Sequence, residues 1–183
     1  MIYPIVAYGD TVLKKKASPV TQGELDVKKL AEDMFETMYE ANGVGLAAPQ
    51  IGKSIRFFVV DAEPMDEEKL VGFKKVFINA TILEESGEEW AYQEGCLSIP
   101  GVREEVTRKS VIKIHYWDEN WVEHTDVFDG LAARVIQHEY DHIEGVLFTD
   151  YLSPFKKRIL KGKLTGISRG VARADYRMRF PAK

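Results

Sequence analysis

The chain has 183 residues, 45% of them hydrophobic, and a formal net charge of −4 at pH 7. This length and composition predict a single domain with a substantial core. The N-terminus lacks the charged start and apolar run of a signal peptide, and no run of about 18 apolar residues is present that could span a membrane. We therefore expect a cytoplasmic protein and exclude a secreted or membrane-spanning one.

Short strand patterns and three helical patterns follow one another along the chain. Runs rich in β-branched and aromatic residues are separated by turn-forming Asp, Asn, Gly and Glu residues. The predicted strands are 56–60, 76–78, 89–92, 105–108, 111–117 and 121–127, and the predicted helices are 25–39, 131–144 and 154–163. Asp129 is the predicted N-cap of the second helix, and Gly145 is its natural stop. This pattern predicts an α+β fold, with antiparallel sheets packed around the helix 131–144.

A glycine-rich segment, G-V-G-L-A-A-P-Q, runs from Gly43 to Gln50 after the first predicted helix. Its alternating glycines and its two alanines allow another backbone to approach closely. It lacks the G-x-G-x-x-G spacing of dinucleotide loops and the Gly-Lys-Ser/Thr ending of phosphate loops. The segment is either a tight connection from helix to strand or part of a site in which the Gln50 amide donates to a developing oxyanion.

The only cysteine, Cys96, lies in the segment Q-E-G-C-L-S-I-P-G. Gly95 frees the backbone before the thiol, and Pro100-Gly101 predicts a turn shortly after it. An unpaired cysteine is most often a small buried apolar residue. Cys96 is therefore either a core residue or a thiolate ligand.

The predicted helix 131–144 carries the motif H-E-Y-D-H, from His138 to His142. On a helix, this H-E-x-x-H spacing places two imidazoles one turn apart on one face, with Glu139 beside them. Leu131 and Val135 continue the same stripe, so both histidines point into the protein. The structural alternative is a pair of core histidines bonded to backbone carbonyls. The spacing favours a hydrolytic metal site, because two of only 4 histidines fall here.

A catalytic metal site needs a third protein ligand and an open position for water. Common H-E-x-x-H proteases take that ligand from downstream of the motif. This chain has no His after His142 and no Glu after Glu144, which is too close to fold back. The ligand must lie upstream, and the thiolate of Cys96 would complete a three-ligand set like that of known catalytic zinc centres.

The segments 43–50, 94–98 and 138–142 together resemble the peptide deformylases, which remove the formyl group from the N-terminus of new polypeptides in bacteria and organelles. The resemblance is to the type I bacterial enzymes. It extends from the N-terminal Y-P-I-V to about residue 153. Three such motifs in this order and at these separations are highly specific. The resemblance implies an α+β fold and a metal-dependent amidase that releases formate from formyl-methionyl nascent peptides.

The resemblance also implies a role for each residue of the site. Glu139 would be the general acid and base, and the Leu97 N–H and the Gln50 side chain would stabilise the oxyanion. The implied metal ligands are Cys96, His138 and His142. One divalent ion is expected, with iron(II) as the native metal and zinc, nickel or cobalt able to replace it; thiolate and imidazole alone do not choose between iron and zinc. A single cysteine fits a reducing compartment.

Substrate contacts follow from the same resemblance. The peptide would lie alongside a strand through main-chain bonds that tolerate any sequence. That strand comprises Gly43, Val44, Gly45 and Leu46. The other implied substrate contacts are Glu94, Arg103, Leu131 and Val135, with Tyr92 beside the methionine pocket. Arg103 is either near the peptide or a solvated surface charge. The aliphatic stem of Arg134 would line the pocket while its charge reaches water.

The charge of the chain is uneven. Residues 156–183 contain ten Lys or Arg and one Asp. We therefore expect a catalytic deformylase domain over 1–165 and a basic, flexible tail over 166–183. The tail is either simply solvated or docks on ribosomal RNA or protein near the nascent-chain exit.

Two other classes of protein fit parts of the pattern. A metallopeptidase with Cys96 as a ligand would cleave internal peptide bonds. A non-catalytic ribosome-associated protein would keep the basic tail but would not need Glu139 beside a metal.

Overall fold

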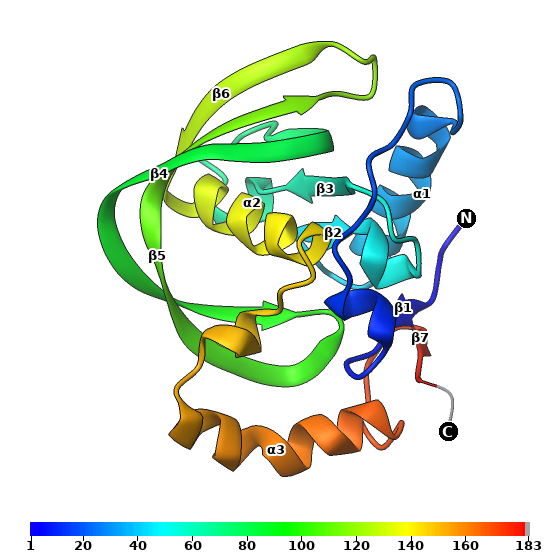
Figure 1. Cartoon of the computed structure of the whole chain (residues 1–183), viewed down its shortest axis with the longest axis vertical. Coiled ribbons are helices and arrows are strands. Elements are labelled where there is room, and N and C mark those ends of the chain that lie inside the picture. Colours follow the sequence, from blue (N-terminus) through cyan, green and yellow to red (C-terminus); the bar gives the residue numbers. More distant parts are fainter. Residues whose placement is uncertain (182–183) are drawn as a thin grey trace.

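The computed structural model describes residues 1–181 and is built on a five-stranded antiparallel sheet. The strands are hydrogen-bonded in the order β2-β3-β4-β5-β6. Their bounds are β2 (Gly45–Ala47), β3 (Phe57–Asp61), β4 (Lys74–Cys96), β5 (Ile99–Trp117) and β6 (Glu123–Asp129). Figure 1 shows the sheet curving around α2 (Gly130–Ile143), the helix that carries the H-E-x-x-H motif. The predicted α+β fold is confirmed.

The long β4–β5 hairpin contains four of the six predicted strands. The predicted runs 76–78 and 89–92 belong to β4, and 105–108 and 111–117 belong to β5. The turn-forming residues between the runs lie at β-bulges instead of chain reversals, because the register shifts between Ile78 and Thr81, again near Glu84, and again between Ser86 and Glu89. Such bulges bend a strand and increase its twist, which lets one hairpin wrap around the central helix.

A last shift of register lies next to the thiol. Gly95 pairs with Arg103, but Cys96 already pairs with Ile99. The reversal of the chain is at residues 97–98. The predicted turn at Pro100-Gly101 is therefore wrong: these residues lie in β5, where Gly101 takes a φ of +76°. The tight reversal presents Cys96 at the very end of β4.

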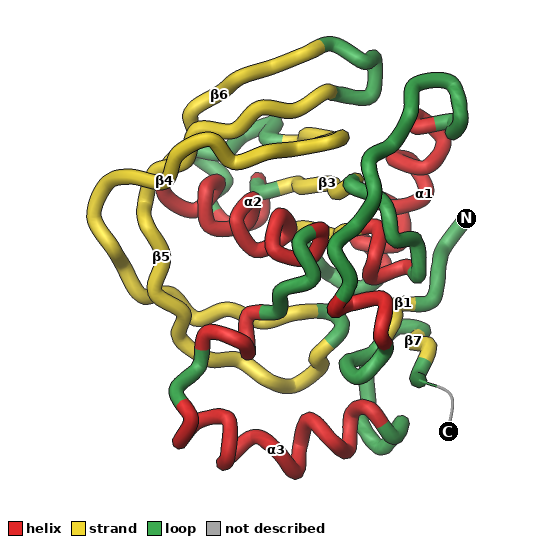
Figure 2. Tube along the Cα trace, viewed as in Figure 1, coloured by secondary structure: helices red, strands yellow, loops and turns green. Residues whose placement is uncertain are grey.

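Residues 1–181 contain three α-helices; Figure 2 draws the helices in red, inside and beside the curved sheet. They are α1 (Val27–Glu40), α2 and α3 (Pro154–Ser168). Asp26 caps α1 by accepting from the Lys29 N–H, whereas the Asp129 side chain makes no capping bond to α2. The predicted stop of α2 is correct: Gly145 has a φ of +74°, and a Cβ there would lie 2.7 Å from the Lys14 carbonyl oxygen. Short 3₁₀ helices span Thr11–Lys14, Ala48–Ile51, Glu63–Met65 and Phe148–Tyr151.

One face of α2 is held against the sheet by buried apolar side chains. Ala133, Ile136 and Ile143 pack in one cluster with Phe58 and Phe77. Burying each large side chain contributes about 1.5–3 kcal/mol. Because α2 is anchored on this face, the histidines one turn apart on another face have fixed positions.

The C-terminal segment returns to the start of the chain. After α3 it forms β7 (Met178–Arg179), which pairs in parallel with β1 (Ile5–Val6). The Ile5 N–H donates to the Arg177 carbonyl at 2.9 Å. The predicted division at residue 165 thus falls inside α3, and the segment that follows packs on the N-terminal strand. Within residues 1–181, no helix has the length and apolar character needed to cross a membrane.

Candidate metal centre and active site

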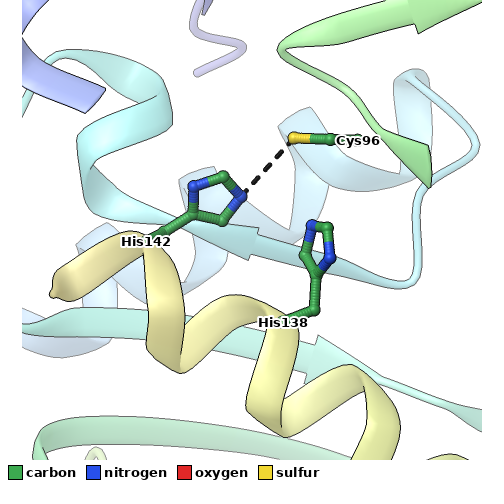
Figure 3. Close-up of side chains that lie close together, drawn as sticks. All are labelled: Cys96, His138 and His142. Atoms are coloured by element: carbon green, nitrogen blue, oxygen red, sulfur yellow. Dashed lines mark hydrogen bonds between the residues drawn. The ribbon is translucent and has the colours of Figure 1, made fainter. Parts of the chain in front are cut away.

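Two elements bring three candidate metal ligands together. His138 and His142 project from successive turns of α2, and Cys96 projects from the end of β4, as Figure 3 shows. The ligand atoms of the three side chains all lie within 4.8 Å of one another. The Cys96 Sγ atom lies 3.5 Å from Nε2 of His142. The fold therefore brings together the three residues that the sequence predicted as a set.

The donor set fits a catalytic divalent ion. For a tetrahedral site with metal–sulfur bonds of about 2.3 Å and metal–nitrogen bonds of about 2.0 Å, sulfur and nitrogen lie roughly 3.5 Å apart. The separation of 3.5 Å between Cys96 and His142 agrees with that value. Burial lowers the pKa of His142 well below its ordinary value, so its imidazole is neutral at neutral pH, as a ligand must be.

A buried carboxylate orients His138. Glu94 accepts at 2.9 Å from Nδ1 of His138, which leaves Nε2 as the nitrogen available to a metal. Burial alone would raise the pKa of Glu94, but its hydrogen bonds with His138 and Arg108 outweigh this effect and hold the pKa well below its usual range. Arg108 binds Glu94 through Nε at 2.7 Å and Nη2 at 2.9 Å. Glu94 is therefore an ionised anchor for a metal-binding imidazole.

Arg134 lines the active-site cavity, as expected of its stem, but the expectation for its charge is wrong. Its charge does not reach water: the residue is only 2% exposed, and Nη1 donates to Glu94 Oε2 at 2.8 Å. The guanidinium also donates to the carbonyls of Val106 and Trp90 and lies 4.6 Å from the Trp90 ring centroid. Because its charge is paired with Glu94, Arg134 can occupy an otherwise apolar interior.

Glu139 lies beside the ligands in a buried position. It is 4% exposed, and its Oε2 atom has no hydrogen-bond partner within residues 1–181. Burial raises the pKa of Glu139 to about 7. A Cβ on Gly45 would lie 2.6 Å from Oε1 of Glu139. The second glycine of the G-V-G segment is therefore needed to make room for this carboxyl group.

Gln50 is fixed next to the thiol. Its Nε2 lies 3.5 Å from Cys96 Sγ and 3.2 Å from Ser98 Oγ, and its Oε1 accepts from the Ala47 N–H. The side chain of Leu97, beside Cys96 in the chain, packs over Gly43. The glycine-rich segment and the cysteine segment thus form adjoining parts of one site, with the Gln50 amide directed toward it.

A cavity of about 580 Å³ opens onto these groups. Among the predicted substrate contacts, its walls include Gly43, Val44, Gly45, Glu94, Arg103, Val135 and Tyr92. Two other predicted contacts are not among the wall residues: Leu46 is fully buried in the core, and Leu131 lies outside the walls, so their substrate contacts stay predictions. Glu94 lines the cavity, and both of its carboxylate oxygens are bonded to protein groups, so its substrate contact stays a prediction.

Several residues of the site were not anticipated. Met65 lines the cavity from a short 3₁₀ helix, and the segment Arg173–Tyr176 lines it from beyond α3. Arg108 donates to both Glu94 and Asp141. None of these residues belongs to a motif with a recognisable spacing. The position of Arg134 on the helix stripe is the one sequence feature that could have suggested a buried partner, but its charge was expected to reach water.

The fold and the site define a metal-dependent hydrolase: a buried carboxyl group lies beside three ligand atoms, and Cys96, His138 and Glu139 line one cavity. A polypeptide deformylase family model matches residues 2–158. The chain belongs to the polypeptide deformylase family, whose metal-dependent members remove the N-formyl group from newly made polypeptides, and it has this hydrolase activity.

Individual relatives match this chain over nearly its whole length. The peptide deformylase of Cytophaga hutchinsonii is 61% identical, with 100% of each chain covered. That of Salinibacter ruber is 45% identical, over 96% of this chain and 93% of its own. The crystal structure of peptide deformylase from Thermus thermophilus matches with a TM-score of 0.84 and 42% identity, over 93% of this chain and 99% of that one.

Proposed function

We propose that Cys96, His138 and His142 bind the catalytic metal and that Glu139 transfers protons during hydrolysis of the formyl amide. The single observation that carries this proposal is the convergence of the three ligand atoms, within 4.8 Å of one another, beside the buried carboxyl group of Glu139. When bound there, a divalent ion would supply Lewis acidity and lower the pKa of a coordinated water to about 7.

Glu139 is suited to take and return a proton. Burial raises its pKa to about 7, so the two protonation states have similar free energies at neutral pH. The carboxylate takes a proton from the attacking water and gives it to the amine that leaves. Positioned acid–base groups of this kind contribute about 10²–10⁴ in rate. The products are formate and a free amino terminus.

Gln50 and Leu97 donate to the negative charge that develops on the formyl oxygen. Gln50 is suited to this role because hydrogen bonds to Ser98 and Ala47 hold its amide beside the thiol. The amide therefore needs no reorganisation during the reaction. The Leu97 N–H belongs to the tight reversal that follows Cys96. Loss of one such donor typically lowers kcat about 10²–10³-fold.

The substrate is a formyl-methionyl peptide that adds to the edge of the sheet. β2 is the terminal strand of the sheet, pairs with β3 on one side, and its first residue, Gly45, lines the cavity. Main-chain hydrogen bonds to such an edge strand can form with a peptide of any sequence. Val135, Tyr92 and Val44 supply apolar surface for the methionine side chain. A formyl carbon carries only hydrogen, so a site this close to Glu139 favours it over an acetyl group.

Iron(II) is the proposed native metal, with zinc, nickel or cobalt able to occupy the same ligands. One thiolate and two imidazoles suit both iron and zinc. Metal analysis of protein prepared without oxygen, with kcat measured in the same sample, tests the assignment. Higher kcat per bound zinc than per bound iron would overturn it.

The decisive experiment for the reaction measures formate released from formyl-Met-Ala-Ser by anaerobically prepared protein. Glu139→Gln should keep its metal and lose about 10²–10⁴ in kcat, whereas Glu32→Gln, on the exposed side of α1, should match the unaltered protein. Full activity of Glu139→Gln would refute the proton-transfer role. Casein serves as the second substrate, because cleavage of its internal bonds would indicate a metallopeptidase.

Ribosome contact in the cytoplasm is the proposed role of the basic C-terminal part. Lys157, Arg158 and Lys161 are exposed on α3, whereas Lys156 is paired with Glu104. Replacing the three exposed cations by Gln should weaken co-sedimentation with ribosomes at low salt and leave tripeptide turnover intact. Unchanged co-sedimentation would contradict this role.

A further inference from the structure

Four residues beyond α3 form part of the wall of the catalytic cavity. Arg173, Ala174, Asp175 and Tyr176, here called the C-terminal strap, line the same cavity as Cys96 and Glu139. The strap lies outside the residues matched by the family model, which end at 158. In Figure 1 the orange-to-red segment rises from the end of α3 toward β1 and β7, where the strap leads. A segment that follows the family core therefore contributes to its active site.

The strap is fixed at both ends. Before it, the Val171 N–H donates to the Gly166 carbonyl at 2.9 Å and closes the end of α3. After it, the Arg177 carbonyl accepts from the Ile5 N–H, and β7 pairs with β1. A four-residue connection between two such anchors has few conformations, so it can act as a stable wall.

Tyr176 joins the strap to the metal end of the cavity. Its hydroxyl donates to the Leu97 carbonyl at 2.7 Å, and its ring packs with Leu97 on the core cluster beside α1. Burial raises the pKa of Tyr176 to about 12, so the hydroxyl remains a donor at neutral pH. Leu97 follows Cys96 directly, which places this end of the strap next to the candidate metal ligands.

Arg173, at the other end of the strap, also lines the cavity wall. Three residues of extended chain span at most about 10 Å. An extended substrate covers the same length with about three residues. A strap that begins beside Leu97 can therefore flank the residues that follow formyl-methionine. Arg173 and Asp175 are exposed, and Arg173 joins Arg103 as a second exposed guanidinium on the wall. The guanidinium of Arg173 can donate to a backbone carbonyl of the peptide, and the carboxylate of Asp175 can accept from a backbone N–H.

We propose that the C-terminal strap binds the second and third residues of the formylated peptide, with Arg173 as the donor and Tyr176 as the anchor that positions the strap. This inference rests on the proposed function and specifies its substrate as a peptide of at least three residues. The strap then determines which peptide lengths are preferred, whereas the metal ligands and Glu139 carry out hydrolysis.

The experiment compares kcat/KM for formyl-Met-Ala-Ser amide with kcat/KM for formyl-methionine amide, using the metal-loaded full chain. Arg173→Ala should lower the ratio of the two values about 3- to 10-fold, mainly through KM of the longer substrate, because one hydrogen bond to the peptide is lost. Tyr176→Phe should lower the same ratio by loosening the strap. The matched controls are Arg169→Ala, an exposed arginine outside the cavity wall, and Tyr39→Phe, whose hydroxyl bonds Asp61 at the surface. Both controls should keep the ratio.

The outcomes separate the two levels of the proposal. Absence of formate from either substrate with the unaltered protein would contradict the proposed function itself. Normal activity with a ratio that stays within twofold in Arg173→Ala would overturn the strap proposal alone. Arg173 is exposed, so this variant gives an answer even if Tyr176→Phe fails to fold. Equal losses on both substrates would also refute it, because they indicate a general structural effect.

Discussion

The buried cluster of Glu94, Arg108 and Arg134 allows a sharp test of how the site is held together. Glu94 is 4% exposed as a side chain, and the two arginine side chains are 7% and 2% exposed. Glu94→Gln keeps the size of the side chain and an oxygen for His138, but it removes the charge between two guanidinium groups. Arg108 retains Asp141 at 2.9 Å, whereas Arg134 retains only backbone carbonyls and aromatic faces.

The expected magnitude follows from these contacts. Removing one partner of a buried ion pair costs about 3–5 kcal/mol, because the remaining charge is uncompensated. Domains are stable by about 5–15 kcal/mol, so Glu94→Gln should fold with a much lower unfolding midpoint. Arg134→Met should cost about 1–3 kcal/mol by leaving buried acceptors without a donor. In the double variant the uncompensated guanidinium is gone, so its destabilisation should fall short of the sum of the single values by about 1–3 kcal/mol.

Urea unfolding in the presence of a chelator measures these free energies without a contribution from metal binding. Glu32→Gln, an exposed substitution on α1, provides the control for a change of one charge. Additivity of the two single effects within about 0.5 kcal/mol would refute the view that Arg134 depends on Glu94. A second readout is metal affinity, which should fall about 10–100-fold in Glu94→Gln because His138 loses its charged partner.

Two further predictions concern groups around the ligands. Gly45→Ala should lower kcat and destabilise the fold by about 1–3 kcal/mol, because its Cβ would lie 2.6–2.9 Å from three atoms of Glu139. Steady-state kinetics and thermal unfolding measure the two effects. A normal kcat would show that catalysis does not require the Glu139 carboxyl group to stay in this position. Gln50→Ala should lower kcat about 10²–10³-fold with bound metal retained, and a loss confined to KM would assign the amide to substrate binding instead.

The local features of the site could be predicted from the sequence because each depends on a short spacing. The positions of His138 and His142 follow from the helical repeat, and Gly145 ends the helix because its backbone is left-handed. The approach of Cys96 to the histidines could not be derived this way. It depends on the reversal at 97–98 and on the bulges of the β4–β5 hairpin. The sequence indicated it only indirectly, because no third ligand was available downstream of His142 and because the motifs resemble those of a family.

Arg134 shows why the remaining errors occurred. Its place in the apolar stripe of α2 was evident, but its partner Glu94 is forty residues away on β4. No local pattern reports that a strand will place a carboxylate under a helix, so the side chain was expected to reach water. The same reason applies to the strap: Tyr176 meets Leu97 only because β7 pairs with β1, a contact between the two ends of the chain.

These long-range contacts have a common consequence for the chemistry. Glu94 orients a candidate metal ligand and also neutralises two arginines that connect α2 to the hairpin, so the ligand cannot reorient unless a cluster of buried charges is also disrupted. Glu139 is confined in turn by Gly45. The atoms closest to the reaction are therefore those with the least freedom to move, which is the condition for hydrogen bonds to favour the transition state without reorganisation. Arg173 and Asp175, by contrast, are exposed on the cavity wall, where substitution changes the substrates accepted at little cost to the fold.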